Sequence, residues 1–141
     1  MKILFDTNAY IAEALLGEAA TIAIETTLTA SWRIYTCQTI LDEIERILVE
    51  RLNVQASHAL LTKQRCRRRA TLIAERPSKH RVPGDPNDSP ILAAACDAGV
   101  DYLVTNDKLL LSLDPYESVR IISMAAFIDM LQDEGLIDSH K

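Results

Sequence analysis

Residues 3–8 read Ile-Leu-Phe-Asp-Thr-Asn, a short apolar run that ends in a polar turn. Apolar residues then recur at helical spacing from Tyr10 to Leu15, and Gly17 follows them. This order predicts a strand, a turn and a helix, with Asp6 at the point where the strand ends. The unit therefore places a carboxylate at the carboxyl end of a strand.

Similar units follow along the chain. The expected helices are 18–30, one that begins at Thr39, 55–76, 89–98 and 124–131, and the expected strands are 33–37, 102–105 and 119–122. Thr39-x-x-Asp42 has the form of a capping box, which would leave Glu43 as the free acid of that helix. Alternating strands and helices predict a parallel sheet covered on both faces, because parallel strands need crossover connections.

The bulk properties limit the class of protein. A length of 141 residues predicts one domain, and no stretch has the length of a signal-peptide core or a membrane span. Three cysteines without CxxC spacing are typical of small buried residues in a reducing compartment. His58, His80 and His140 are expected to face solvent, and nothing favours nucleophilic catalysis. We therefore expect a soluble cytoplasmic protein that has no membrane association.

Four acids, Asp6, Glu43, Asp88 and Asp107, lie where a strand leads into a helix or in the first turn of that helix. In a parallel α/β sheet such positions meet at one edge, where ligands bind. Each acid alone could simply cap a helix. Clustered carboxylates, however, raise one another's pKa unless a cation neutralises them, and an all-oxygen set suits Mg²⁺ or Mn²⁺. The combined placement therefore favours a metal-dependent enzyme of phosphate chemistry.

The order and spacing of four local strings resemble the PIN domain, the fold of many bacterial and archaeal toxin ribonucleases. The strings are Ile3-Leu-Phe-Asp6-Thr-Asn8, Thr39-Ile-Leu-Asp-Glu43-Ile, Asp85-Pro-Asn-Asp88-Ser-Pro-Ile-Leu-Ala-Ala95 and Asp101-Tyr-Leu-Val-Thr-Asn-Asp107-Lys-Leu-Leu. The resemblance covers nearly the whole chain, with a single domain over 1–133 and a C-terminal tail over 134–141. It implies a three-layer α/β sandwich whose central parallel sheet has about five strands flanked by helices.

The resemblance also implies a function, an Mg²⁺- or Mn²⁺-dependent endoribonuclease that hydrolyses RNA phosphodiester bonds. The implied catalytic residues are Asp6, Glu43, Asp88 and Asp107, the metal ligands Asp6, Asp88 and Asp107, and the supporting residues Thr7, Asn8, Thr105 and Asn106. A toxin role, an antitoxin protein as partner and a homodimer follow from the same likeness. Many relatives carry a further acid two residues after Asp107, and here that place is Leu109.

The net charge of −5 conceals an uneven distribution of basic residues, since 8 of the 15 lysines and arginines lie within residues 63–81. Lys63, Arg67 and Arg68 fall on adjoining faces of the expected helix, and phosphate contact is one interpretation. A solvated helix face, or a face that meets an acidic partner, is the other.

A phosphatase of the haloacid dehalogenase type is not supported, because that chemistry needs a second aspartate where this chain has Asn8. One alternative for the function stays open. A non-catalytic protein- or RNA-binding module on a PIN-like scaffold would keep the fold without the chemistry. The sequence also leaves open the nucleic acid that is cut and whether the role is that of a toxin or of RNA processing.

Overall fold

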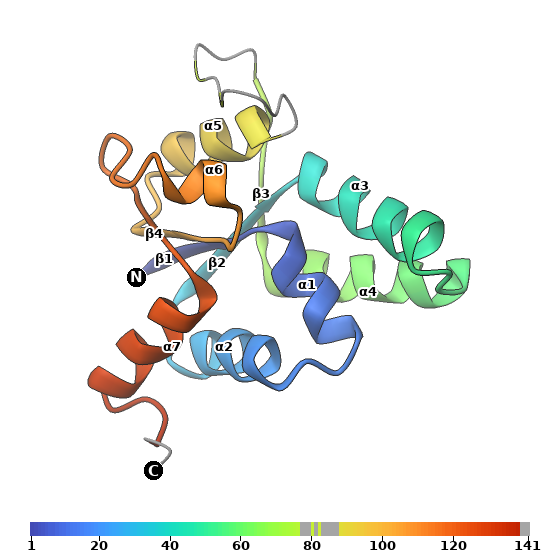
Figure 1. The fold of residues 1–141 in the computed structure, drawn as a ribbon, viewed down its shortest axis with the longest axis horizontal. Helices are drawn as coiled ribbons and strands as arrows, with labels where there is room; N and C mark the ends of the chain where they lie inside the picture. The colour runs from blue at the N-terminus through green and yellow to red at the C-terminus, as the bar shows by residue number, and fades with distance from the viewer. Residues whose placement is uncertain (77–79, 81, 83–87, 139–141) are drawn as a thin grey trace.

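The computed structural model describes residues 1–76, 80, 82 and 88–138, and its centre is a sheet of five parallel strands in the order β3-β2-β1-β4-β5. The strands are β1 Lys2–Phe5, β2 Arg33–Cys37, β3 Thr71–Ile73, β4 Tyr102–Val104 and β5 Arg120–Ile122. The helices are α1 Thr7–Ala14, α2 Glu18–Thr29, α3 Gln38–Arg46 with its π-helical continuation η1 Ile47–Arg51, α4 Ala56–Arg69, α5 Asp88–Ala98, α6 Lys108–Leu111 and α7 Met124–Asp133. Helices cover both faces, with α5 on one side of the strands and α1 and α2 on the other (Figure 1). The three-layer α/β fold with five strands is thus confirmed.

The chain reverses its direction of travel across the sheet at β1. It moves from β1 outward to β2 and β3, and then returns to place β4 and β5 on the other side of β1. Phe5 of β1 pairs with Val104 of β4, and the amide of Asp6 donates to the Val104 carbonyl at 2.9 Å. In open α/β sheets the crevice for ligands lies at this switch point, outside the carboxyl ends of the strands.

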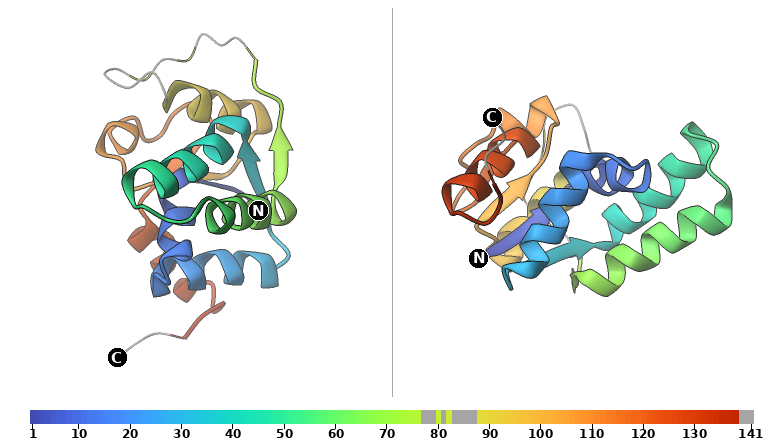
Figure 2. Two further views of the ribbon diagram at one scale, coloured as in Figure 1. Left: turned by 90° about the vertical axis from the view of Figure 1, so that its right-hand side faces the viewer. Right: turned by 90° about the horizontal axis from the view of Figure 1, so that it is seen from below.

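The core fixes the helices that surround the switch point. Ile3, Leu4 and Phe5 are fully buried, as expected for a central parallel strand. The Phe5 ring meets Tyr10 of α1 and Phe127 of α7 edge to face, with ring centroids 6.3 and 5.4 Å away. The Phe5 side chain of β1 therefore packs against both α1 and α7. Figure 2 shows α1, α2 and α7 around that part of the sheet from two further directions.

The predicted helix over 55–76 is wrong at its carboxyl end. Helix α4 ends at Arg69, Ala70 is extended, and Thr71–Ile73 pair with β2 as the edge strand β3. Two of these three strand residues, Thr71 and Ile73, are β-branched, and such side chains fit a pleated sheet better than a helix. Strand β3 has only three residues, which is too short for the alternation of apolar and polar residues to show in the sequence.

The predicted capping box is also wrong. Helix α3 begins at Gln38, so Thr39 already lies inside it, and the Thr39 amide and hydroxyl both donate to the Glu75 carboxylate. Asp42 accepts from the Gln38 side chain and lies 3.6 Å from the Lys63 ammonium group. Glu43 nevertheless points toward the start of α1, where its carboxylate accepts a hydrogen bond from Thr7. The capping bond of Asp42 that the sequence suggested is not the cause.

No helix in the described ranges has both the length and the apolar character that a membrane-spanning helix needs.

Strand β5 is held at the sheet edge by a carboxylate whose charge should matter at low pH. The Asp114 carboxylate accepts from Arg120 at 3.0 Å and from the Ile121 amide at 2.6 Å, and these donors lower the pKa of Asp114 below its usual 3.8. A lowered pKa in the folded state gives stability that is present above the unfolded pKa and is lost as pH falls through the folded pKa. We expect Asp114→Asn to be less stable than the parent at neutral pH, with the difference shrinking below pH 3.8. Urea unfolding at a series of pH values measures it, and a difference that stayed constant with pH would contradict the assignment.

Candidate functional site

Asp6 follows the last residue of β1 and caps helix α1. Its Oδ1 atom accepts at 2.7 Å from the amide of Thr7, the first residue of α1, and its side chain is buried. Its Oδ2 atom accepts from the Thr105 hydroxyl at 2.7 Å. Both of these donors are uncharged, so they fix the carboxylate without adding a positive charge.

Thr105 connects Asp6 to Asp107 across the switch point. The Asp107 amide donates to the Thr105 hydroxyl oxygen at 3.0 Å, while that hydroxyl donates to Asp6. The Oδ1 atom of Asp107 accepts from the amides of Leu109 and Leu110 at 2.8 and 3.3 Å and so caps α6. Within the described residues its Oδ2 atom accepts no hydrogen bond. Asp107 therefore caps a helix and still offers one oxygen to a ligand.

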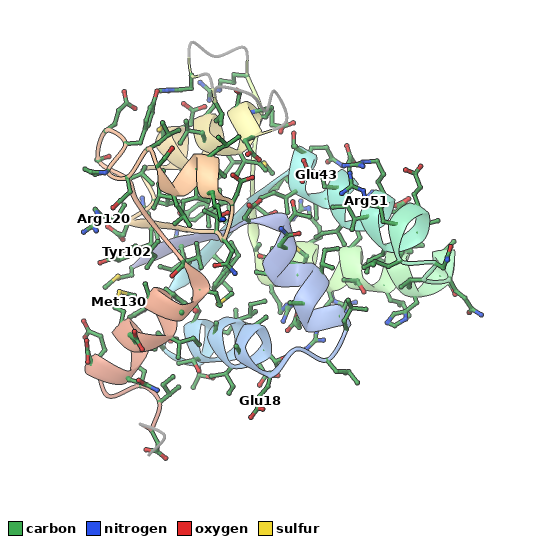
Figure 3. The ribbon with its side chains drawn as sticks, in the orientation of Figure 1. Glu18, Glu43, Arg51, Tyr102, Arg120 and Met130 are labelled. Carbon is green, nitrogen blue, oxygen red and sulfur yellow. The ribbon has the colours of Figure 1, made fainter. Side chains whose placement is uncertain are left out.

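Thr7 connects Asp6 to Glu43 in the same way. The Thr7 amide binds Asp6, and the Thr7 hydroxyl donates to Oε2 of Glu43 at 2.7 Å. Glu43 lies in the second turn of α3, where Ile40 and Ile44 are fully buried and hold the helix against the core. Figure 3 shows Glu43 on the part of α3 that lies close to the sheet. Packing of α3 thus presents Glu43 to the start of α1.

Asp88 is the acid that helix α5 carries. It lies in the first turn of α5 and is buried, and its neighbour Ser89 accepts from the Val82 amide at 2.8 Å. Helix α5 packs against α3, β2 and β3. The hydrogen bonds above join Asp6, Glu43 and Asp107 into one network, and Asp88 lies on α5, which packs against the helix that carries Glu43. Of the supporting residues expected from the sequence, Thr7 and Thr105 belong to this network.

Asn8 and Asn106 have other surroundings. Asn8 is exposed in the first turn of α1. The Asn106 side chain accepts from the Met124 amide at 3.1 Å, which ties the end of β4 to the start of α7. Asn106 therefore orders the edge of the site from outside, and its side-chain oxygen is directed to a helix end.

The donor set can be compared with the needs of a divalent cation. Within the part of the chain that the structure describes, no three of these carboxylates bring oxygen atoms within 4.8 Å of one another. Mg²⁺ commonly keeps several waters and takes only one or two protein carboxylates, so a hydrated ion does not need a tighter cluster. The donors are all hard oxygens, which suits Mg²⁺ or Mn²⁺. The residues present fit such an ion.

The basic residues expected to contact RNA differ from one another in their surroundings. Lys63 lies 3.2 Å from Glu45 and 3.6 Å from Asp42, so two carboxylates already neutralise its charge. Arg67 and Arg68 are exposed in the last turn of α4, which leads into the amino end of β3. The acids follow the carboxyl ends of strands parallel to β3. Arg67 and Arg68 therefore lie at the opposite end of the strands from the acidic site.

Arg46 is a basic residue near the acids that the sequence analysis did not single out. Arg46, Glu43, Asp42 and Thr39 line an open hollow of about 230 Å³ on α3. The only signal in the sequence is the spacing of three residues between Glu43 and Arg46, which places both on one face of a helix. An exposed guanidinium beside an acidic site can bind a phosphate oxygen.

Comparison with known families classifies the chain. The family model described as PIN domain matches residues 2–109. The chain belongs to the PIN domain family. PIN domains are generally nucleases and typically bind divalent metals, which supports a hydrolase role in general. No curated protein and no solved structure was found to match. A single domain over 1–133 with a tail over 134–141 stays a prediction.

Proposed function

We propose that this PIN domain is an Mg²⁺- or Mn²⁺-dependent endoribonuclease that hydrolyses RNA phosphodiester bonds at the edge formed by Asp6, Glu43, Asp88 and Asp107. One observation carries the proposal. The Thr7 hydroxyl donates to the Glu43 carboxylate, and the Thr105 hydroxyl donates to the Asp6 carboxylate and accepts from the Asp107 amide. With the bond from the Thr7 amide to Asp6, these contacts link the three acidic residues at the switch point of the sheet. Helix capping alone needs neither hydroxyl, because the caps of α1 and α6 are made by backbone amides.

The four acids have separate roles in this proposal. Asp6, Asp88 and Asp107 would hold the cation, one or two of them directly and the others through its bound waters. A bound Mg²⁺ would neutralise charge on the phosphate and the leaving group and would lower the pKa of a water that it coordinates. Glu43, fixed through Oε2 by Thr7, accepts a hydrogen bond from the attacking water and orients it in line with the bond that breaks. The protein thus contributes placement, while the cation contributes charge.

The direct test is cleavage of mixed cellular RNA by the purified protein in Mg²⁺, in Mn²⁺ and in EDTA. We expect cleavage with either metal and none with EDTA. Absence of cleavage under every condition, together with absence of Mn²⁺ binding in a titration, would contradict the proposal and favour the non-catalytic binding module.

Thr7→Val tests how Glu43 is positioned. Valine keeps the shape of the buried Thr7 side chain and leaves its amide bond to Asp6, but it removes the 2.7 Å bond to Glu43. Loss of a group that orients a site residue commonly lowers activity by roughly 10- to 100-fold, and we expect that loss in kcat. Thr27→Val is the matched control, since Thr27 is equally buried and donates only to the Ala23 carbonyl of its own helix. Equal activity of the two variants would remove Thr7 from the mechanism.

Charge reversal can distinguish two candidate regions of contact with the RNA backbone, Arg46 on α3 and the pair Arg67 and Arg68 on α4. We expect Arg46→Glu to weaken RNA binding more than Arg67→Glu/Arg68→Glu does, because Arg46 borders Glu43 and the arginine pair lies at the other end of the strands. Each phosphate contact that is lost should reduce the salt slope of binding by about one. Binding measured on an Asp6→Asn background, which prevents cleavage, gives both slopes. A stronger effect of the double variant would place the RNA on α4.

The toxin role, an antitoxin partner and a homodimer stay predictions that depend on the family resemblance, and a cytoplasmic location stays a prediction from the bulk properties of the sequence. Growth arrest on expression that is lost in Asp6→Asn would support the toxin role. Co-purification and light scattering test the two protein partners, and a monomer that captures no inhibitor would count against both.

A further inference from the structure

A second group of metal-ligating side chains lies outside the acidic site. His80, Cys96 and Glu117 each offer one ligand atom, and these atoms lie within 4.8 Å of one another. The three residues come from separate segments: the connection between β3 and α5, helix α5 itself, and the connection between α6 and β5. The mechanism proposed above uses none of them.

His80 is fixed within this group. The sequence suggested a solvent-facing side chain, but the structure buries it, with 7% of the residue exposed. Its Nδ1 atom lies 2.6 Å from the Tyr116 hydroxyl, and the two rings meet edge to face at 5.3 Å. Its Nε2 atom lies 3.9 Å from Oε2 of Glu117. A histidine metal ligand usually donates its other ring N–H to an acceptor, and the Tyr116 hydroxyl oxygen can accept that bond from Nδ1 when Nε2 binds a metal.

The donor types select a cation different from that of the acidic site. Thiolate, imidazole and carboxylate together are a ligand set for Zn²⁺, whereas Mg²⁺ prefers oxygen alone. Tetrahedral zinc with bonds of about 2.0 to 2.3 Å separates its ligand atoms by about 3.3 to 3.7 Å. The 3.9 Å between His80 and Glu117 needs only a small contraction to reach that range. Burial, with Glu117 close by, raises the pKa of the Cys96 thiol to about 12, so only a cation with high affinity for thiolate can displace its proton.

We propose that His80 Nε2, Cys96 Sγ and a Glu117 carboxylate oxygen form a zinc site with water in the fourth position. Binding replaces the thiol proton of Cys96 with the metal and releases that proton to solvent. The three bonds tie the connection between β3 and α5 to α5 and to the connection that follows α6. Because α5 carries Asp88 in its first turn, the zinc site stabilises the segment from which that acid is presented.

Cobalt substitution tests the site without any measurement of cleavage. The full-length protein, treated with a chelator and then freed of it, is titrated with Co²⁺, whose bond to thiolate gives a strong near-ultraviolet band and whose tetrahedral complexes absorb in the visible. We expect both signals at one equivalent, their loss on addition of Zn²⁺, and an upward shift of the thermal unfolding midpoint when Zn²⁺ is bound.

Three variants make the result specific. Cys96→Ser should abolish the thiolate band, and Glu117→Gln, at an exposed residue whose change leaves the core intact, should weaken Co²⁺ binding at least tenfold. Asp6→Asn, which alters the acidic site, should leave the titration unchanged. Absence of the thiolate band in the parent protein, or an equal band in Cys96→Ser, would overturn the proposal whatever the nuclease assay shows.

Discussion

Asp6→Asn should lower metal-dependent RNA cleavage by roughly a thousandfold or more, while the free energy of unfolding changes by only about 1 kcal/mol. The large effect has an electrostatic origin. Asparagine has the shape of aspartate but no charge, so it binds a divalent cation poorly and neutralises none of its charge. Rates of cleavage in Mg²⁺ and EDTA measure the first quantity, and urea unfolding measures the second.

The small effect on stability follows from the hydrogen bonds of Asp6. The amide oxygen of asparagine can still accept from the Thr7 amide, so the cap of α1 is kept. The Thr105 hydroxyl, which donates to Asp6 in the parent, can rotate and accept from the new amide group instead. Asp133→Asn, at an exposed position in α7, is a matched control for the change in charge. Full activity of Asp6→Asn would exclude Asp6 from the site, and a collapse in stability would show that Asp6 has mainly a structural role.

The sequence revealed most of the fold because the buried strands are continuous apolar runs that end in polar turns. Residues 3–8 are the clearest case, and the strand at residues 102–104 is found in the same way. Strand β3 was missed because its three residues follow directly on an arginine-rich helix. Pairing with β2 makes this segment a strand, and the local sequence carries no information about that pairing.

The proximity of Asp6, Glu43 and Asp107 was predictable from the sequence, whereas the hydrogen bonds that hold them were not. Parallel topology alone brings the acids after β1, β2 and β4 to one edge. The bond from Thr7 to Glu43 depends on the packing of α1 on α3, and the group of His80, Cys96 and Glu117 depends on three loops and helices. Residues separated by long stretches of chain show no spacing rule, so such contacts appear only in three dimensions.

The largest effect on stability is expected from Glu13, a buried carboxylate in α1 that plays no part in the acidic site. Its oxygens accept two bonds from the Arg69 guanidinium, at 2.6 and 2.9 Å, and Arg65 lies 3.6 Å away. Burial lowers the pKa of Arg69, but the hydrogen bonds and charge of Glu13 outweigh burial and raise it. The pair attaches α4 to α1 inside the protein.

Glu13→Ala should therefore destabilise the fold by about 3 to 5 kcal/mol, because it leaves the charge of Arg69 in a poorly hydrated place without its partner. Stabilities of whole domains are about 5 to 15 kcal/mol, so the variant should be partly unfolded at warm temperatures. Urea unfolding measures the loss. Asp114→Asn, which breaks the more exposed pair with Arg120, is the comparison and should cost about 1 kcal/mol or less.

A double variant separates the charge of Glu13 from the packing around it. Glu13→Leu/Arg69→Met removes both charges and fills the space with apolar atoms, so it should recover most of the stability that Glu13→Ala loses. Because neither side chain touches the acids, the folded fraction of every variant should cleave RNA at the parent rate when assayed in the cold. A single Glu13→Ala variant as stable as the parent would mean that Arg69 reaches water without its partner, and that apolar packing alone attaches α4 to α1.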